Sequence, residues 1–299
     1  MKLFSVFIVS VVIIAAGCAD SNSRIAYPGP TPDSSALVFM PGIVSRTEND
    51  SLDFNSCFSP DGKAFYFSRS ARGKYNIYVS YFKDNKWQQP ILAPFTEEKY
   101  NEADPMFHPD GSLYFMSNRP KNATDTAPDF DIWVIKQNNK GEWSAPENVT
   151  AVNSDSTEYY VSFASNGNLY FASDRNGGAG LWDIYVSKPT NGKYSKPENL
   201  GTAIKSDSSE HDPCVSRDEQ LLLFTSVGRK DGYGEGDIYF SQKDKDGNWS
   251  IAKNIGNYIN TPSYEYCSYF SPDGKYYFFS SNFDIKWIDR NYLIKKINK

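Results

Sequence analysis

The residues with the clearest chemical potential are acids that recur at one position along the chain. Each lies eight residues before the Asp or Asn of a turn, and the five acids are Asp53, Glu102, Glu158, Glu210 and Glu265. Carboxylates gathered at one place create a negative potential that attracts a metal cation or a positively charged ligand. The alternative is structural: each acid caps a loop or accepts hydrogen bonds from backbone N–H groups. Repetition in every copy favours the structural alternative.

Two copies carry a second acid two residues further on. They are Glu102-Ala103-Asp104-Pro105 and Glu210-His211-Asp212-Pro213, whereas the other copies have Asn55, Tyr160 and Cys267 at that position. A binding site breaks the symmetry of a repeat. These two segments are therefore the best candidates for a ligand-binding site. A histidine beside two acids can act as a general base or a metal ligand, although a lone histidine in a loop is more often exposed or hydrogen-bonded.

Four arginines also recur, at Arg69, Arg119, Arg175 and Arg229. We expect them to pair with acids between neighbouring repeats. The alternative is an arginine cluster that binds a carboxylate or sulfate ligand.

These residues belong to a repeat that recurs every 49 to 56 residues. Its first copy contains Phe58-Ser59-Pro60-Asp61-Gly62, then the aromatic segment Ala64-Phe65-Tyr66-Phe67-Ser68, and then Asn76-Ile77-Tyr78. Two apolar runs joined by a Pro-Asp-Gly turn predict a hairpin, and the Ile-Tyr segment predicts a third strand. An aromatic residue, such as Trp87, is expected to begin a fourth strand. Four short strands per unit of this length are typical of a β-propeller blade.

The Pro-Asp-Gly hairpin with its following Asp-Ile-Tyr strand resembles the TolB-type propeller repeat, a WD-like repeat of bacterial envelope proteins. The resemblance covers the chain from about Asp53 to the C-terminus. It implies an all-β propeller, in which the five copies of the repeat predict five blades of four antiparallel strands; six blades, the number in TolB itself, are the alternative. It implies little about function, because this fold serves many roles.

The fifth repeat lacks the tail that ends the others, so its outer strand must come from elsewhere. Residues Ala36 to Ser45 look like an isolated outer strand. We therefore expect an N-terminal strand to close the ring, which leaves no open sheet edge. The alternative is that Tyr292 to Ile297 supplies the strand.

The N-terminus predicts export and a lipid anchor. An apolar stretch from Leu3 to Ile14 follows Met1-Lys2, as in a secretory signal peptide. Ala15-Ala16-Gly17-Cys18 resembles a bacterial lipobox, so Cys18 is the expected lipid attachment site; an ordinary signal peptide is the alternative. The expected organisation is a signal peptide over 1–17, a flexible tether over 18–35 and the propeller over 36–299. We expect a location in the cell envelope, at the outer membrane, on either its periplasmic or its outer surface.

Composition excludes several classes of protein. A net charge of -5, from 31 Lys+Arg and 36 Asp+Glu, argues against a nucleic-acid partner. Two histidines are too few for a His-rich metal site. Three cysteines, Cys57, Cys214 and Cys267, fall on expected innermost strands and should be buried; if two of them pair, Cys57 and Cys267 are the expected partners.

No catalytic set is recognisable, so we expect a non-enzymatic binding or scaffold module for an envelope protein or a glycan. The alternative is an extracellular glycan-active hydrolase or lyase that uses acids at the channel mouth. No cofactor is expected, apart from a divalent cation that the central channel could hold. The candidate ligand-site residues are Asp53, Glu102, Asp104, Glu158, Glu210, His211, Asp212 and Glu265.

Overall fold

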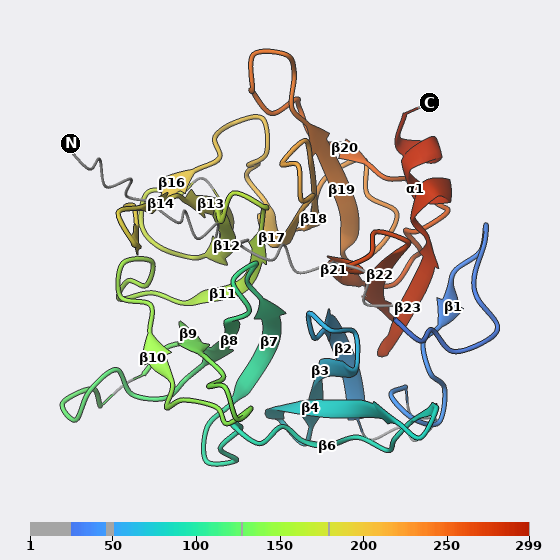
Figure 1. The fold of residues 1–299 in the computed structure, drawn as a ribbon. Coiled ribbons are helices and arrows are strands. Elements are labelled where there is room, and N and C mark those ends of the chain that lie inside the picture. The colour runs from blue at the N-terminus through green and yellow to red at the C-terminus, as the bar shows by residue number, and fades with distance from the viewer. Residues whose placement is uncertain (1–24, 46–50, 127, 179, 299) are drawn as a thin grey trace, which may run out of the picture.

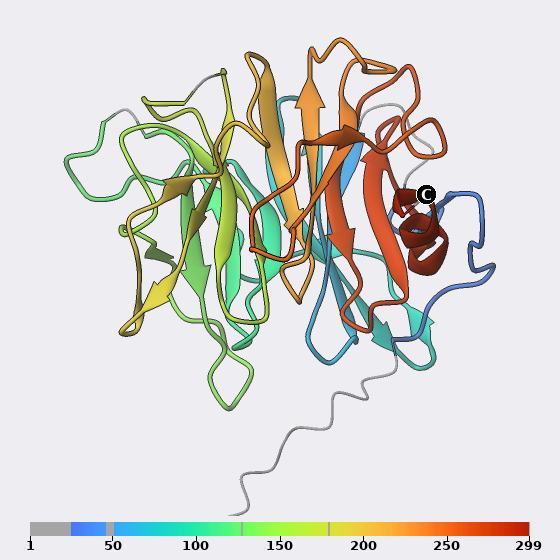
Figure 2. The same cartoon turned by 90° about the horizontal axis from the view of Figure 1, so that it is seen from above.

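A computed structural model shows five four-stranded antiparallel sheets arranged as a ring around a central axis (Figure 1). Figure 2 shows the same ring turned by 90°. The structure describes residues 25–45, 51–126, 128–178 and 180–298. The predicted five-bladed propeller is confirmed, and the six-bladed alternative is wrong.

Each blade begins with the strand nearest the axis and ends with a short outer strand. Blade 1 contains β2 (Ser51–Phe58), β3 (Ala64–Ala71), β4 (Lys74–Lys83) and β6 (Ile91–Leu92). Blade 2 contains β7 (Glu102–Phe107), β8 (Leu113–Ser117), β9 (Asp131–Ile135) and β10 (Glu147–Asn148). Blade 3 contains β11 (Glu158–Phe163), β12 (Leu169–Ser173), β13 (Asp183–Ser187) and β16 (Glu198–Asn199). Blade 4 contains β17 (Ser209–Val215), β18 (Leu221–Val227), β19 (Asp237–Gln242) and β20 (Lys253–Asn254). Blade 5 contains β21 (Glu265–Phe270), β22 (Tyr276–Ser281), β23 (Asp284–Asp289) and β1 (Leu37–Val38).

The ring is closed by an N-terminal strand, as predicted. Strand β1 pairs antiparallel with β23, with Leu37 opposite Trp287. Phe39 follows β1 and is fully buried. The alternative closing segment is wrong, because Arg290–Ile297 forms the helix α1. The Asp289 side chain caps this helix by accepting a hydrogen bond from the Tyr292 N–H, and Leu293 and Ile297, four residues apart, are buried on one face.

The repeated aromatic residue does not begin the outer strand, which corrects the expected fourth strand. Trp87 lies in β5 (Lys86–Trp87), which folds back on the end of β4, and Tyr194 lies in β15 (Lys193–Tyr194), which pairs with β14 (Pro189–Thr190). The outer strands β6 and β16 begin a few residues later. The aromatic residue therefore closes a small extra hairpin, and the Pro-containing segment after it carries the chain to the outer edge.

We name the two faces of the ring by their connections. The turn face carries the turns between the first and second strands, and the loop face carries the loops between the second and third strands. Part of the expected tether packs on the turn face: Ile25 lies against Gly62, and the Tyr27 hydroxyl donates to Asp273 at 2.7 Å. The expected signal peptide and Cys18 lie outside the described residues. Among the described residues, no helix is both long enough and apolar enough to cross a membrane.

A β-bulge interrupts the first strand of every blade, two residues after the recurrent acid. The register with the second strand shifts there, and the bulged residue has a positive φ of 50° to 59°. The five bulged residues are Asn55, Asp104, Tyr160, Asp212 and Cys267. An extra residue breaks the strict alternation of side chains, so neighbouring residues can both face the axis. Left-handed backbone at non-glycine residues is uncommon and gathers at functional sites.

Candidate functional site

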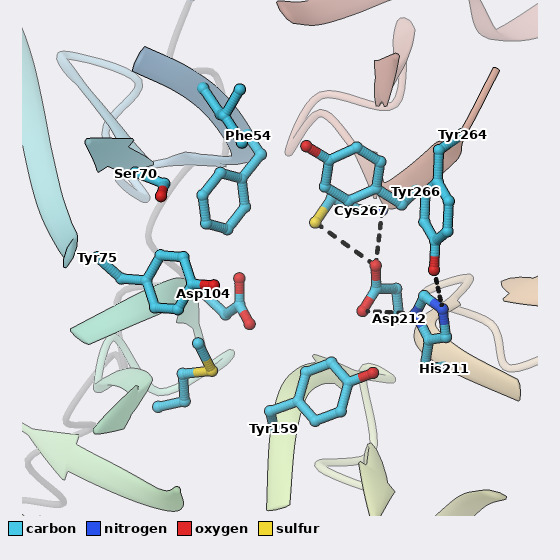
Figure 3. A pocket seen from close by; sticks show the side chains of 12 residues that line it. Phe54, Ser70, Tyr75, Asp104, Tyr159, His211, Asp212, Tyr264, Tyr266 and Cys267 are labelled. Carbon is cyan, nitrogen blue, oxygen red and sulfur yellow. Dashed lines mark hydrogen bonds and ion pairs between the residues drawn. The ribbon is translucent and has the colours of Figure 1, made fainter. Parts of the chain in front are cut away.

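A cavity of about 310 Å³ lies at the mouth of the ring on the loop face (Figure 3). All five blades contribute to its lining, because the first strands begin at this mouth and converge on the axis. A central pocket shared by the blades of a propeller is a typical place for a ligand.

Most of the wall is a continuous series of rings that we call the aromatic collar. Its members are Tyr75, Phe54, Tyr266, Tyr264, His211 and Tyr159. Each ring contacts the next, with centroids between 5.4 and 6.2 Å apart. The collar passes from blade 1 through blades 5 and 4 to blade 3, so it surrounds the cavity on all sides except that of blade 2.

Asp104 occupies the gap in the collar. Blade 2 has Ala103 where the other blades place a ring, and the next residue, Asp104, is buried and lines the cavity. Its backbone N–H donates to the Ser68 hydroxyl at 2.9 Å, but its Oδ1 has no hydrogen-bond partner among the described residues. Burial raises the pKa of the Asp104 carboxyl well above its ordinary value, and repulsion by Asp212 raises it further.

Asp212, in contrast, is tied into the wall. Its Oδ2 accepts a hydrogen bond from the Cys267 backbone N–H at 3.0 Å, which links blades 4 and 5. Its Oδ1 lies 3.2 Å from His211 Nδ1, and His211 Nε2 lies 2.7 Å from the Tyr264 hydroxyl. The two acids therefore differ: Asp212 organises one side of the cavity, whereas Asp104 presents an oxygen that no described residue pairs.

Tyr160 crosses the ring instead of lining an open channel. Its hydroxyl, on blade 3, donates to the Ser268 carbonyl on blade 5 at 2.8 Å, and the side chain is fully buried. A tyrosine that spans the axis in this way obstructs a continuous channel.

The five recurrent acids do not line the cavity, although each is buried at the start of a first strand. Glu158 shows the arrangement: it accepts hydrogen bonds from the N–H and hydroxyl of Ser154 and from the Ser173 hydroxyl, and it forms an ion pair with Arg175 at 2.8 Å. Ser206 and Thr261 make the same two bonds to Glu210 and Glu265. This geometry fits the structural interpretation, in which each acid caps the loop that enters its blade.

The recurrent arginines pair with these acids inside a blade, not between blades as expected. Arg69 lies opposite Asp53 in the β2–β3 register, with 2.5 Å between Arg69 Nε and Asp53 Oδ1. The same pairing joins Arg119 to Glu102, Arg175 to Glu158 and Arg229 to Glu210. Each guanidinium also packs over aromatic rings of the second and third strands; Arg175, for example, lies 4.9 Å from the Tyr185 ring centroid. These arginines are therefore part of the blade and do not line the cavity.

Comparison with solved structures finds the same ring elsewhere. A protein assigned as TolB from Agrobacterium tumefaciens superposes with a TM-score of 0.50 and 19% identity, over 77% of this chain and 70% of that one. The chain has the fold of a TolB-type β-propeller. TolB from Acinetobacter baumannii superposes with a TM-score of 0.48 and 16% sequence identity, over 79% of this chain and 54% of that one. A thermostable family-43 glycoside hydrolase superposes with a TM-score of 0.52 and 11% sequence identity, over 82% of this chain and 91% of that one. No family model and no curated protein sequence matches the chain.

In this TolB-type propeller, three of the predicted site residues meet at the cavity: Asp104, His211 and Asp212. Sequence reasoning missed the tyrosines and Phe54 of the aromatic collar. A signal for them existed, because Phe54, Tyr159, His211 and Tyr266 each directly follow a recurrent acid. A strict alternation of side chains would let only one of two neighbouring residues line the cavity, whereas the bulge lets both His211 and Asp212, and both Tyr266 and Cys267, line it.

The remaining predicted groups are not assembled into a site. Cys57, Cys214 and Cys267 are buried and free, so the Cys57–Cys267 disulfide considered from the sequence is not formed. Within the described ranges, no group of three or more His, Cys, Asp or Glu side chains is placed to hold a metal ion.

Asp104→Asn is expected to stabilise the folded protein at neutral pH, by about 1.4 kcal/mol for each pH unit between about 4 and the raised pKa, because asparagine has no charge for burial to penalise. The pKa of Asp104 is raised in the folded state, so the folded protein binds more protons than the unfolded chain, and wild-type stability falls as pH rises above about 4. The gain should therefore disappear near pH 4. Urea unfolding at several pH values checks this, with the exposed Asp246→Asn as control. A variant less stable than wild type at pH 7 would show that Asp104 has a structural partner.

Proposed function

We propose that this chain is a cell-envelope lipoprotein whose loop face binds a partner protein without catalysing a reaction. The observation that supports this most is that three exposed apolar side chains lie in loops of the loop face, the face on which the cavity lies. Leu181 is 77% exposed, Phe283 64% and Tyr233 51%. They lie in the β12–β13, β22–β23 and β18–β19 loops, all on the loop face. Apolar side chains gathered around a pocket are typical of a protein-binding surface.

The loops that carry these side chains are held in place by neighbouring blades. The Leu181 N–H donates to the Ser208 carbonyl, and the Glu235 N–H donates to the Ser263 carbonyl. The Phe283 carbonyl accepts from the Asp53 N–H at 3.0 Å. Backbone bonds of this kind reduce the ordering cost on binding, so the rim can act as a preformed surface.

This partner can be tested with the full-length protein, purified in detergent and used to capture proteins from an envelope extract. Leu181→Ser combined with Phe283→Ser should remove a partner that the wild type captures. Ile251→Ser is the matched control, because Ile251 is also 77% exposed but lies between β19 and β20, outside the loops of the loop face. Equal capture by the rim variant and the control would contradict the proposal.

We further propose that a lipid on Cys18 holds the turn face toward the outer membrane. Ile25 lies seven positions after Cys18, and an extended chain over seven steps spans at most about 25 Å. Because Ile25 and Tyr27 pack on the turn face, the cavity would open away from the membrane and toward a partner. Neither the periplasmic nor the outer surface is favoured by this geometry.

Cys18→Ala should release the protein from the membrane fraction, because a single exported domain without its lipid has no other hydrophobic anchor in the proposal. Fractionation followed by immunoblotting measures the result, and Ser21→Ala in the same segment is the control. Membrane attachment that persists in Cys18→Ala would refute lipid anchoring.

The second candidate is a glycan-active enzyme, and the pairing of Asp104 with Asp212 favours it. Two carboxyl groups in unlike environments are what glycoside hydrolysis requires. The fold is also shared with a family-43 glycoside hydrolase. Turnover of a glycan panel that is lost in Asp104→Asn would support this candidate and contradict the non-enzymatic one.

A further inference from the structure

We infer that the cavity binds the ammonium group of a lysine side chain that the partner protein inserts between Asp104 and the aromatic collar. The inference deepens the proposed function, on which it rests for the source of the lysine. Four properties of the site support it: its charge, its rings, the geometry of its acids and its size.

The acids of the cavity are not compensated by a basic side chain. Asp104 and Asp212 both line it, and no lysine or arginine is among the lining residues. Asp104 is 4% exposed, and its Oδ1 has no hydrogen-bond partner in the described part of the chain. Figure 3 shows its carboxylate turned into the space between the blades. A buried acceptor without a donor is costly, so a ligand that supplies a donor and a positive charge would gain from it.

The aromatic collar supplies the other half of a cation site. The negative faces of aromatic rings attract an ammonium group within about 6 Å of the ring centroid. Tyr75, Tyr159 and Tyr266 come from three different blades and surround the same space (Figure 3). A collar interrupted by one carboxylate would suit a cation that projects apolar methylene groups between the rings.

The geometry favours lysine over a metal ion or arginine. Calcium takes six to eight oxygen ligands, but this cavity offers two carboxylates, and Asp212 already accepts from Cys267 and contacts His211. The planar guanidinium of arginine is suited to a bidentate carboxylate pair, whereas the ammonium of lysine is a compact charge that one carboxylate can neutralise. A volume of about 310 Å³ can hold the end of one such side chain.

Binding should be linked to proton release. The groups around Asp104 are Asp212 and His211 on blade 4, Tyr159 on blade 3, and Tyr266 and Cys267 on blade 5. A bound cation favours ionised Asp104, so affinity should rise with pH through the range in which the free site loses its proton. Tetramethylammonium has no proton of its own to lose, so any fall in its affinity at low pH reports protonation of the site.

The test uses calorimetry on the full-length protein with Nα-acetyl-lysine methylamide and its Nε-acetylated analogue, which lacks the charge. We expect the charged compound to bind at least tenfold more tightly than the analogue. Asp104→Asn should lower the affinity for the charged compound at least tenfold, and Tyr75→Leu should lower it severalfold. Asp246→Asn should leave this affinity unchanged. Tetramethylammonium should bind more weakly as pH is lowered.

Equal binding of both compounds, equal affinity in Asp104→Asn, affinity independent of pH, or binding of Ca²⁺ in preference to the amines would each overturn the inference. Its failure is distinguishable from that of the proposed function. If a partner is lost when Leu181→Ser and Phe283→Ser are combined but is still captured by Asp104→Asn, the loop face binds a protein and the inference of an inserted lysine is wrong. If the amines bind but no captured partner depends on Leu181 and Phe283, the cavity binds a free amine and the inference of a lysine from a partner protein is wrong.

Discussion

Glu158→Gln is expected to lower the free energy of unfolding by about 3–5 kcal/mol, the typical cost of removing one partner of a buried ion pair. Glu158 is fully buried, and its two oxygens accept from Ser154, Ser173 and Arg175. Glutamine has one acceptor and adds a donor that would face these donors, so Arg175 would lose its counter-charge. Urea unfolding followed by intrinsic fluorescence measures the effect.

The control for this change is Glu147→Gln, because Glu147 is exposed at the outer strand of blade 2. It should alter stability by less than about 0.5 kcal/mol, as surface substitutions usually do. If Glu158→Gln kept wild-type stability but lost a ligand, the recurrent acids would be a binding ring after all. The experiment therefore separates the two meanings that the repeated acids had in the sequence.

Phe39→Ala is expected to lower the free energy of unfolding by about 3–5 kcal/mol, because it removes a large buried ring from the closure of the propeller. Phe39 is 0% exposed and contacts Phe65 of blade 1 and both Phe278 and Trp287 of blade 5. It therefore packs across the junction where the last blade meets the first. Thermal or urea unfolding measures the loss.

Val38→Ala is the matched control, since Val38 precedes Phe39 in the same segment but is 37% exposed. Its change should cost less than about 1 kcal/mol, because little apolar surface is lost from the core. Equal losses in the two variants would mean that strand pairing by β1, and not ring packing by Phe39, dominates the closure.

Local patterns were sufficient to predict the blades. Pro60-Asp61-Gly62 defines a turn by its own backbone preferences, and the apolar aromatic run Ala64–Ser68 predicts a strand, so neither needs a distant contact. The missing tail of the fifth repeat and the extra segment near Leu37 predicted the closure for a similar reason, since an open sheet edge is unfavourable. The final helix was missed because Tyr292 and its neighbours suit a strand and a helix alike, and the Asp289 cap decides between them.

The candidate site was predictable only in part. Asp104 and Asp212 were distinguished in the sequence because they break the symmetry of the repeat, but their different roles were not readable there. Asp212 is tied to Cys267, which is 55 residues away along the chain, and Asp104 has no such partner for its Oδ1. That difference depends on which blades face each other across the axis.

The sequence by itself determined the repeat, the number of blades, the closing strand and the acids of interest, because turn residues and side-chain alternation act over a few neighbouring positions. Only the tertiary structure decided where the acids act. It paired four of the five recurrent acids with arginines and Glu265 with the hydroxyls of Thr261 and Ser281, and among the described residues it left one oxygen of Asp104 without a partner. The physical reason is the bulge with positive φ in every first strand: it lets neighbouring residues such as His211 and Asp212 both line the cavity, which five separate segments of chain form at the axis.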